Sequence, residues 1–265
     1  MKQETTSTLL SQVQDITRRA GNIILEHWDR PKDIRYKGRV DLVTQTDLAV
    51  ETFLTRELGA LLPKATFLAE ETAAENELEQ LTWIVDPLDG TTNFAHGLPA
   101  VATSIALWQN NGLELGVINL PRTGECFHAQ RNCGAWLNGT PIQVSTQNTL
   151  EQALVATGFP PHTKRERMED IVPMLRNVLS TCRGMRRMGA AAVDLAYTAC
   201  GRFDAFYELG LKPWDTAAGW LLVREAGGRV SQFSPVAEYT LGAEAILATN
   251  NRLHQDMAEL LENCS

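Results

Sequence analysis

Apolar residues spaced three and four positions apart predict a helix near the start of the chain, over residues 5–29. Pro31 follows this pattern and predicts where the helix ends. The charged and irregular stretch 32–43 predicts an exposed loop. The stripe that we expect to face the core consists of Leu9, Leu10, Val13, Ile16, Ala20, Ile23, Ile24 and Trp28.

A second helix is predicted from about Asp47 to Leu62, with Thr46 as its N-cap and Pro63 beyond its end. The apolar positions again recur at helical spacing. The residues expected to face inward are Leu48, Phe53, Leu54, Leu58 and Leu61.

Short apolar runs predict strands in the next part of the chain, the first two at 66–69 and 83–85. The acidic segment between these two predicts a helix with a solvated face. Turn residues such as Asn110-Asn111-Gly112 and Asn138-Gly139 separate the later runs. Those runs predict strands at 101–108, 113–119, 125–130 and 142–144.

Strands and helices alternate again after residue 150. Apolar runs predict strands at 155–158 and 245–248, and the Gly227-Gly228 pair predicts a helix end. Mixed sheets layered with helices are therefore the expected architecture. The helices are predicted at 164–180, 190–200, 216–226 and 251–263.

Composition narrows the classes of function. The net charge of −8 and the pI near 5.2 argue against direct nucleic-acid binding, which needs a basic surface. The sequence has no stretch of 18 apolar residues and no apolar leader, so we expect a cytoplasmic protein that does not span a membrane. The five cysteines are an odd number without a C-x-x-C pair, which predicts reduced thiols and no zinc site.

The strongest chemical signal is the nine-residue run DPLDGTTNF, from Asp86 to Phe94. It follows the predicted strand 83–85, so Asp86 would stand at the carboxyl end of a strand, where ligands bind in open α/β sheets. Asp89 can turn back toward the same point, and Gly90 permits close approach of the backbone to an anion. A bare Asp-Pro-x-Asp is also compatible with a surface turn, but the complete run favours a binding site.

Two further acidic positions extend this site. Glu70-Glu71 follows the predicted strand 66–69, so two strand ends would bring carboxylates to one edge of the sheet. Asp215 opens the predicted helix 216–226 as its N-cap. Alone, the glutamate pair would be typical of a solvated turn and Asp215 of a simple cap. Together, the carboxylates would repel one another unless a cation lay between them, and such oxygen ligands favour Mg²⁺ or Mn²⁺ over zinc.

These motifs resemble the two signatures of the inositol monophosphatase family, DPLDGTTNF at 86–94 and WDTAAG at 214–219. The segments KGRVDLVTQTD at 37–47, GAWLNG at 134–139 and GAAA at 189–192 also match the pattern of this family, and in particular of its bacterial SuhB-type members. The resemblance covers nearly the whole chain. It implies the α/β (α+β) class, as a layered αβαβα sandwich of the inositol monophosphatase and fructose-1,6-bisphosphatase type. It also implies one catalytic domain over 1–265, with lobes 1–148 and 149–265.

The activity implied by the resemblance is that of an inositol-phosphate phosphatase, a phosphoric monoester hydrolase that uses water activated by Mg²⁺. The substrate would be inositol 1-phosphate or a similar polyol or sugar monophosphate. Two to three Mg²⁺ ions are implied, Mn²⁺ can substitute, and lithium should inhibit. By motif matching, the first ion would be held by Glu70, Asp86 and the carbonyl of Leu88, the second by Asp86, Asp89 and Asp215, and a weaker third by Glu70 with waters.

The resemblance also implies roles around the substrate. Asp47 and Thr91 would orient and deprotonate the attacking water, Lys37 would lie near the phosphate, and Glu71 just outside the metal ligands. The amides of Gly90 and Thr91 would bind phosphate oxygens. The family often has Ser or Thr at position 190, so Ala190 removes one potential hydrogen bond, worth roughly 0.5–1.5 kcal/mol. The substrate side would consist of Asp89, Gly90, Thr91, Gly189, Ala190, Ala191, Glu208 and Asp215.

Several alternatives stay open at this point. Histidinol phosphate, fructose 1,6-bisphosphate and 3′-phosphoadenosine 5′-phosphate are substrates of related families with the same metal core. SuhB-type proteins also act as binding partners of the transcription machinery, so a transcription factor is an alternative partner. A homodimer is implied by the resemblance alone.

Overall fold

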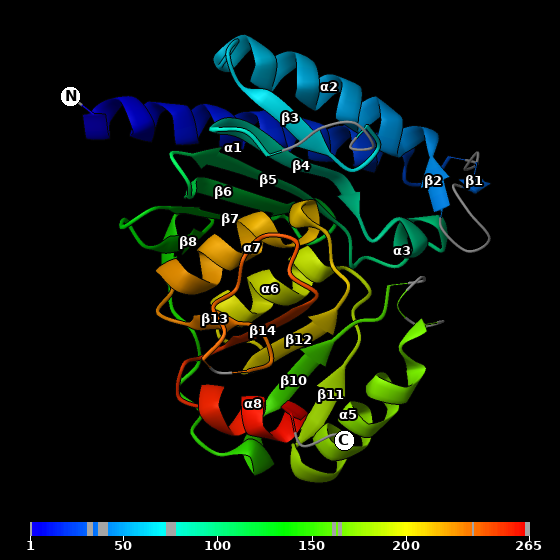
Figure 1. Cartoon of the computed structure of the whole chain (residues 1–265). Helices are drawn as coiled ribbons and strands as arrows, with labels where there is room; N and C mark the ends of the chain where they lie inside the picture. Colours follow the sequence, from blue (N-terminus) through cyan, green and yellow to red (C-terminus); the bar gives the residue numbers. More distant parts are fainter. Residues whose placement is uncertain are drawn as a thin grey trace.

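Two mixed sheets alternate with three layers of helices in the computed structural model (Figure 1). The structure describes residues 2–30, 34–36, 42–72, 78–160, 163, 166–234 and 236–262. The order of layers is helices, sheet, helices, sheet, helices, as the αβαβα prediction requires. None of the helices in these ranges is long and apolar enough to cross a membrane.

The first layer contains α1 (Lys2–His27) and α2 (Gln45–Leu61). The apolar stripe predicted for α1 is confirmed, because Val13, Ala20 and Ile24 are fully buried against the first sheet. On α2 the prediction for Leu48 is wrong, since this side chain is 45% exposed. Leu48 precedes the buried Leu54 by six residues, which places it about 120° away around the helix.

The beginning of α2 also differs from the prediction. Its N-cap is Thr44 and not Thr46, and the Thr44 hydroxyl oxygen accepts a hydrogen bond of 3.1 Å from the Thr46 amide. Asp47 accepts a 2.8 Å bond from the Thr44 amide in return, which completes a capping box. The loop predicted over 32–43 is wrong at its described positions, where β1 (Ile34–Tyr36) pairs antiparallel with β2 (Leu42–Thr44).

The first large sheet has seven strands in the order β3-β4-β5-β6-β7-β8-β9. Only its first pair is parallel; the others are antiparallel. From β5 onward the neighbours are joined by short turns such as Asn138-Gly139, where both residues have positive φ. The strand β8 was not predicted, and β9 lies two residues before the predicted 142–144. The strands are β3 (Thr66–Ala69), β4 (Leu81–Asp89), β5 (Ala102–Gln109), β6 (Leu113–Leu120), β7 (Glu125–Gln130), β8 (Ala135–Leu137) and β9 (Thr140–Ile142).

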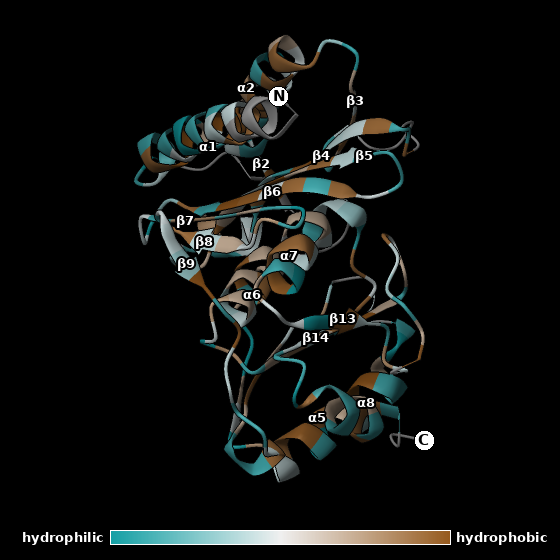
Figure 2. Ribbon diagram, turned by 90° about the vertical axis from the view of Figure 1, so that its left-hand side faces the viewer, coloured by the Kyte–Doolittle hydropathy of each residue, from teal (hydrophilic) through white to brown (hydrophobic). Residues whose placement is uncertain are grey.

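The central layer consists of α6 (Ala191–Ala199) and α7 (Pro213–Glu225), which lie between the two sheets. Small residues let these helices pack closely: a Cβ at Gly219 would lie 2.6 Å from Leu195 Cδ1. Figure 2 shows both helices between the two sheets, and their buried residues belong to one hydrophobic cluster with residues of both sheets. The N-cap of α7 is Lys212, so the prediction that Asp215 caps this helix from the N-cap position is wrong by three residues.

The second sheet has five strands in the order β11-β10-β12-β14-β13. Its outer face is covered by α5 (Met168–Thr181), which begins later than predicted, and α8 (His254–Glu262). A short 3-10 helix, η2 (Leu150–Gln152), precedes this sheet. The predictions missed β11, β12 and β13. The strands are β10 (Leu154–Thr157), β11 (Gly184–Arg186), β12 (Ala205–Leu209), β13 (Arg229–Ser231) and β14 (Ala245–Thr249).

Candidate active site

The parallel pairing of β3 with β4 brings two acidic segments together. Ala69 lies opposite Val85, and the Glu70 amide extends the ladder by donating to the Val85 carbonyl at 3.2 Å. Glu70 therefore follows β3 beside Asp86 of β4. The strand β4 continues to Asp89, so Asp86 does not end it as predicted. However, the pairing with β5 becomes irregular between Asp86 and Asp89, which turns this backbone away from the regular ladder.

Asp86 is buried, with 1% of its surface exposed. Its Oδ1 accepts a hydrogen bond of 3.0 Å from the Leu88 amide. Burial raises the pKa of Asp86 well above its ordinary value, and the nearby charges of Glu70, Asp89 and Asp215 raise it further. The carboxylates predicted from separate motifs thus interact electrostatically around Asp86.

The side chain of Asp89, the last residue of β4, reaches the N-terminus of α6. Its Oδ2 accepts a hydrogen bond of 2.6 Å from the Ala192 amide. Ala190 is the N-cap of α6 and has no hydroxyl, so Asp89 takes over the capping of this helix from another part of the chain. Burial, opposed by the α6 amides, raises the pKa of Asp89 to about 7.

The turn after Asp89 depends on glycine. Gly90 has φ of +88°, and a Cβ there would lie 2.7 Å from the Ala100 carbonyl oxygen. Gly90 is also the N-cap of the short helix α3 (Thr91–Ala95). The Asn93 side-chain amide donates to the carbonyls of Ala100, at 2.7 Å, and Met188, at 2.8 Å. The predicted wall residues beginning at Gly189 are thereby held beside the DPLDGTTNF run.

Asp47 and Thr91, 44 residues apart in sequence, meet as predicted. The Thr91 hydroxyl lies 3.0 Å from Asp47 Oδ1 and 3.1 Å from the Leu88 carbonyl oxygen. Asp47 is fully buried, which raises its pKa, and bonds from Thr44 and Thr91 partly oppose that rise. Because the hydroxyl has one proton, donation to Asp47 leaves the oxygen of Thr91 able to accept a hydrogen bond from a water.

Asp215 and Glu208 come from the second half of the chain. Asp215 Oδ2 accepts a hydrogen bond of 2.7 Å from the Lys212 amide, three residues earlier at the start of α7. Glu208 of β12 is 6% exposed, and burial together with the charges of Asp215 and Asp89 raises its pKa well above the ordinary value, while Arg187 opposes the shift.

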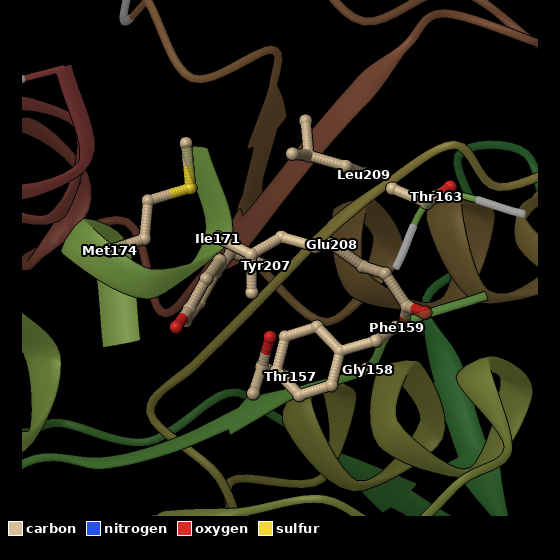
Figure 3. Close-up of a pocket in the computed structure, with 9 residues that line it drawn as sticks. All are labelled: Thr157, Gly158, Phe159, Thr163, Ile171, Met174, Tyr207, Glu208 and Leu209. Atoms are coloured by element: carbon tan, nitrogen blue, oxygen red, sulfur yellow. The ribbon is translucent and has the colours of Figure 1, made fainter. Parts of the chain in front are cut away.

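Glu208 lines a small pocket at the end of β10 and β12 (Figure 3). It lies against the backbone of Gly158, where a Cβ would overlap its carboxylate. The other walls are mostly apolar, and the Thr157 hydroxyl, which is buried, has no hydrogen-bond partner among the described residues. The pocket is lined by Thr157, Gly158, Phe159, Thr163, Ile171, Met174, Tyr207, Glu208 and Leu209.

Two buried carboxylates near the site were not predicted. Asp194 of α6 is 1% exposed, neither of its oxygens has a hydrogen-bond partner among the described residues, and burial and the charge of Glu208 raise its pKa well above the ordinary value. Glu51 of α2 is 5% exposed and accepts a hydrogen bond of 3.0 Å from the Glu71 amide. Glu51 follows Asp47 by four residues, so helical spacing places both on one face, and this signal could have identified it.

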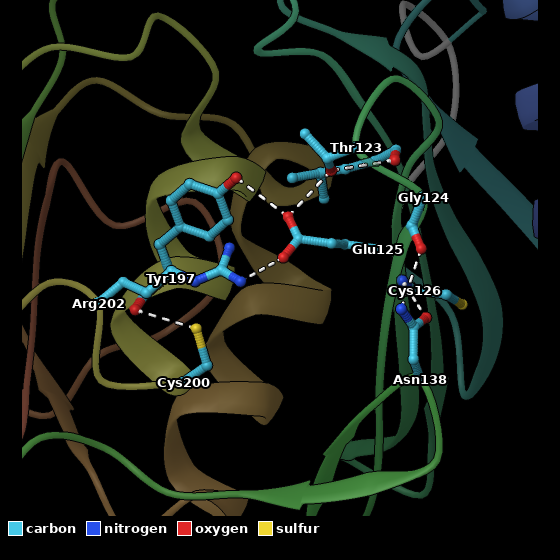
Figure 4. Close-up of polar contacts among 9 residues, drawn as sticks. Thr123, Gly124, Glu125, Cys126, Asn138, Tyr197, Cys200 and Arg202 are labelled. Atoms are coloured by element: carbon cyan, nitrogen blue, oxygen red, sulfur yellow. Dashed lines mark hydrogen bonds and ion pairs between the residues drawn. The ribbon is translucent and has the colours of Figure 1, made fainter.

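A separate polar cluster joins the first sheet to the central layer without any predicted site residue (Figure 4). The carboxylate of Glu125 on β7 accepts hydrogen bonds from Thr123 at 2.9 Å, from Tyr197 at 3.1 Å, and from Arg202. The Arg202 guanidinium also lies 4.5 Å from the centre of the Tyr197 ring. This cluster therefore ties β7 to the end of α6.

The chemistry of the site fits a hard divalent cation. The side chains around Asp86 offer carboxylate oxygens, and the repulsion that raises its pKa is the kind that a cation relieves. Within the described ranges, no group of three or more acidic, histidine or cysteine side chains already converges on one point, so binding would require these carboxylates to turn toward one another. Lys37, predicted near the phosphate, lies outside the described residues.

Known proteins resemble this chain over most of its length. A model of the inositol monophosphatase family matches residues 5–265. An inositol-1-monophosphatase of Synechocystis sp. is 39% identical over 244 residues, which are 91% of this chain and 84% of that protein. Nus factor SuhB of Escherichia coli K12 is 40% identical over 243 residues, which are 91% of this chain and 90% of that protein.

Solved structures of similarly named proteins also resemble this chain in fold. The extragenic suppressor protein suhB of Bartonella henselae superposes with a TM-score of 0.89 at 36% identity, over 97% of this chain and 99% of that one. An inositol monophosphatase from Anabaena superposes with a TM-score of 0.87 at 33% identity, over 97% of this chain and 96% of the other.

Proposed function

Because the chain belongs to the inositol monophosphatase family, whose members are generally metal-dependent phosphatases, we propose that it is a Mg²⁺-dependent phosphomonoesterase. Its substrate is inositol 1-phosphate or a similar polyol or sugar monophosphate, which it hydrolyses to the alcohol and phosphate. The observation that carries the proposal is that the charges of Glu70, Asp89 and Asp215 all act on the buried Asp86, in the motif whose Thr91 bonds to Asp47.

We propose the cation ligands that the family motifs imply for these positions. Glu70, Asp86 and the carbonyl of Leu88 would hold one Mg²⁺, and Asp86, Asp89 and Asp215 a second, with a weaker third at Glu70. Mn²⁺ can replace Mg²⁺, since both accept oxygen ligands. When bound, the cations would neutralise the phosphate charge and lower the pKa of the attacking water.

Side chains of the protein would then orient the attacking water and accept its proton. We assign Asp47 as the base and Thr91 as the residue that relays the proton to it, because their hydrogen bond is already formed at 3.0 Å. If the Leu88 carbonyl is occupied as a ligand, the Thr91 proton is left to Asp47 alone. Lys37 is proposed near the phosphate, and Glu71 outside the direct ligands.

The remaining site residues would bind the two ends of the substrate. The amides of Gly90 and Thr91 are assigned to phosphate oxygens, and Asp89 and Asp215 to the border between phosphate and alcohol. Glu208 would accept hydrogen bonds from hydroxyls of the alcohol, with Gly189, Ala190 and Ala191 as the adjoining wall. Burial of Glu208 beside the apolar pocket supports this role, because few waters would compete for its oxygens.

A substrate panel tests the assignment of reaction and substrate. Phosphate release is measured with Mg²⁺ from inositol 1-phosphate, histidinol phosphate, fructose 1,6-bisphosphate and 3′-phosphoadenosine 5′-phosphate. The proposal expects the highest kcat/KM with inositol 1-phosphate or another polyol monophosphate. A clear preference for one of the other three would replace the substrate, and no release from any of them would refute the function.

A second role is favoured by relatives that are named Nus factor SuhB at 40% identity. We propose, as the alternative of another class, that the chain binds a component of the transcription machinery through protein contacts, with no direct nucleic-acid or membrane binding. A pull-down with purified transcription elongation factors, comparing wild type with a catalytically inactive Asp86→Asn variant, tests it. Equal capture by both supports a separate role, and no capture by either refutes it.

The organisation of the protein is also part of the proposal. We propose a cytoplasmic homodimer of chains that each act as one catalytic domain, with lobes 1–148 and 149–265. The last strand of the first sheet ends at Ile142 and the first strand of the second sheet begins at Leu154, which supports this division. Sedimentation velocity would measure the oligomeric state, and a monomer at micromolar concentration would exclude a stable dimer.

A further inference from the structure

Glu51 is a buried carboxylate to which the proposed mechanism gives no role. It lies on α2, is 5% exposed, and its Oε2 accepts the 3.0 Å hydrogen bond from the Glu71 amide. A buried carboxylate costs free energy unless its hydrogen bonds contribute to the structure. The position of Glu71 in the chain indicates which part of the structure this hydrogen bond stabilises.

Glu71 lies in the turn that follows β3. The Thr72 amide closes this turn by donating to the Ala69 carbonyl at 3.2 Å, and the Glu70 amide bonds to Val85 on β4 at 3.2 Å. The Glu71 amide takes part in neither of these bonds and is directed toward α2. Glu51 therefore fixes the turn from the helix side, at the residue next to the proposed ligand Glu70.

The same face of α2 also fixes the turn that follows β4. Asp47 and Glu51 are four residues apart, so they lie one above the other on the helix. Asp47 bonds to Thr91 after β4, while Glu51 bonds to Glu71 after β3. One rigid helix, which packs against β4 and is anchored at its start by the Thr44–Asp47 capping box, thus holds both strand ends in register (Figure 1).

We infer that Glu51 is a positioning residue for the divalent-cation site: its hydrogen bond to the Glu71 amide holds the Glu70 backbone where the Glu70 carboxylate can join Asp86. This inference rests on the proposed function. Glu51 is assigned no contact with cation or substrate. Groups that orient metal ligands in this way typically change metal affinity roughly 10–100-fold when they are removed.

The experiment distinguishes the effect of losing the Glu51 hydrogen bond from the effect of losing its negative charge and from a loss of protein stability. Glu51→Gln keeps an oxygen that can accept the Glu71 amide, whereas Glu51→Leu removes the acceptor at similar volume. Glu57→Leu is the matched control, because Glu57 lies on the same helix and pairs with Arg19 at the surface. Mg²⁺ binding to each purified protein is measured by isothermal titration calorimetry, together with kcat and KM at saturating Mg²⁺ and the thermal midpoint without metal.

We expect Glu51→Leu to weaken Mg²⁺ binding about tenfold or more, with most of kcat recovered at high Mg²⁺, while Glu51→Gln and Glu57→Leu bind within about twofold of wild type. If Glu51→Leu does not fold, Glu51→Asp, which shortens the side chain by one methylene, should weaken binding in the same direction. Wild-type Mg²⁺ affinity in folded Glu51→Leu or Glu51→Asp would overturn the inference, as would equal losses in Glu51→Gln and Glu51→Leu. A wild-type protein that neither binds Mg²⁺ nor releases phosphate would instead refute the proposed function.

Discussion

Replacing Asp89 by asparagine should stabilise the metal-free protein at alkaline pH, although it removes a proposed metal ligand. The folded state raises the pKa of Asp89 from 3.8 to about 7. A group with a raised folded pKa contributes its full stability below its unfolded pKa and loses that contribution as the pH rises through its folded pKa. The cost of ionising Asp89 therefore grows between about pH 4 and pH 7, and Asp89→Asn avoids it.

The magnitude follows from the size of the shift. Three pKa units correspond to about 4 kcal/mol at most. Burial causes most of this shift, and since the titration of Asp89 is coupled to that of neighbouring carboxylates we expect a gain of about 2–4 kcal/mol. In a protein of this size that is a rise of roughly 5–10 °C in the thermal midpoint. The asparagine Oδ1 can still accept the hydrogen bond from the Ala192 amide, so the capping of α6 is retained.

The assay is thermal unfolding in EDTA at pH 4.5 and at pH 8, followed by circular dichroism, and then at pH 8 with Mg²⁺. Asp89→Asn should exceed wild type at pH 8, lose most of this advantage at pH 4.5, and gain less than wild type from Mg²⁺. Asp204→Asn is the control. Both carboxylate oxygens of Asp204 accept hydrogen bonds, one from the Ser145 hydroxyl at 2.5 Å and the other from the Leu154 amide at 2.7 Å. It should destabilise at both pH values. An Asp89→Asn protein that is less stable than wild type at pH 8, or equally more stable at both pH values, would refute the reasoning.

Three further predictions address other parts of the molecule. Asp86→Asn should keep less than about a tenth of wild-type phosphatase activity without a lower thermal midpoint in EDTA; higher activity would contradict its place between two cations. Li⁺ should inhibit phosphate release uncompetitively at constant ionic strength, because it would occupy the site of Asp86, Asp89 and Asp215 after hydrolysis; equal inhibition by Na⁺ would show only charge screening. Burial lowers the pKa of His254 to about 4. The contribution of the neutral imidazole to the free energy of unfolding is therefore complete above pH 6.5 and is lost as the pH falls toward 4. His254→Gln should therefore flatten the pH dependence of urea unfolding by about 2 kcal/mol over that range, and an unchanged slope would count against this explanation.

The sequence predicted the helices and hairpins that have strong local signals. The stripe of α1 and the turn at Asn110-Asn111 predicted their elements because periodicity and positive φ act over a few residues. The strands β11, β12 and β13 were missed, since they are only three to five residues long and are stabilised by pairing with distant strands. Such pairing leaves little trace in the local pattern.

The sequence likewise predicted only part of the candidate site. The motifs singled out Asp86, Asp89 and Asp215 as candidate ligands, and Asp47 and Thr91, which were assigned to the same step, lie within hydrogen-bond distance of each other. Asp194 and Glu51 were missed because an acidic residue on a helix is usually solvated. Only the packing of neighbouring layers shows that Asp194 is buried, whereas the four-residue spacing from Asp47 was an available signal for Glu51.

The central claim is that cations held by these carboxylates allow the chain to hydrolyse a phosphomonoester. Protein stripped with EDTA and freed of the chelator is assayed for phosphate release from inositol 1-phosphate while Mg²⁺ is added back. We expect no phosphate release without metal and a return of activity as Mg²⁺ is titrated. Full activity in the stripped protein would contradict it.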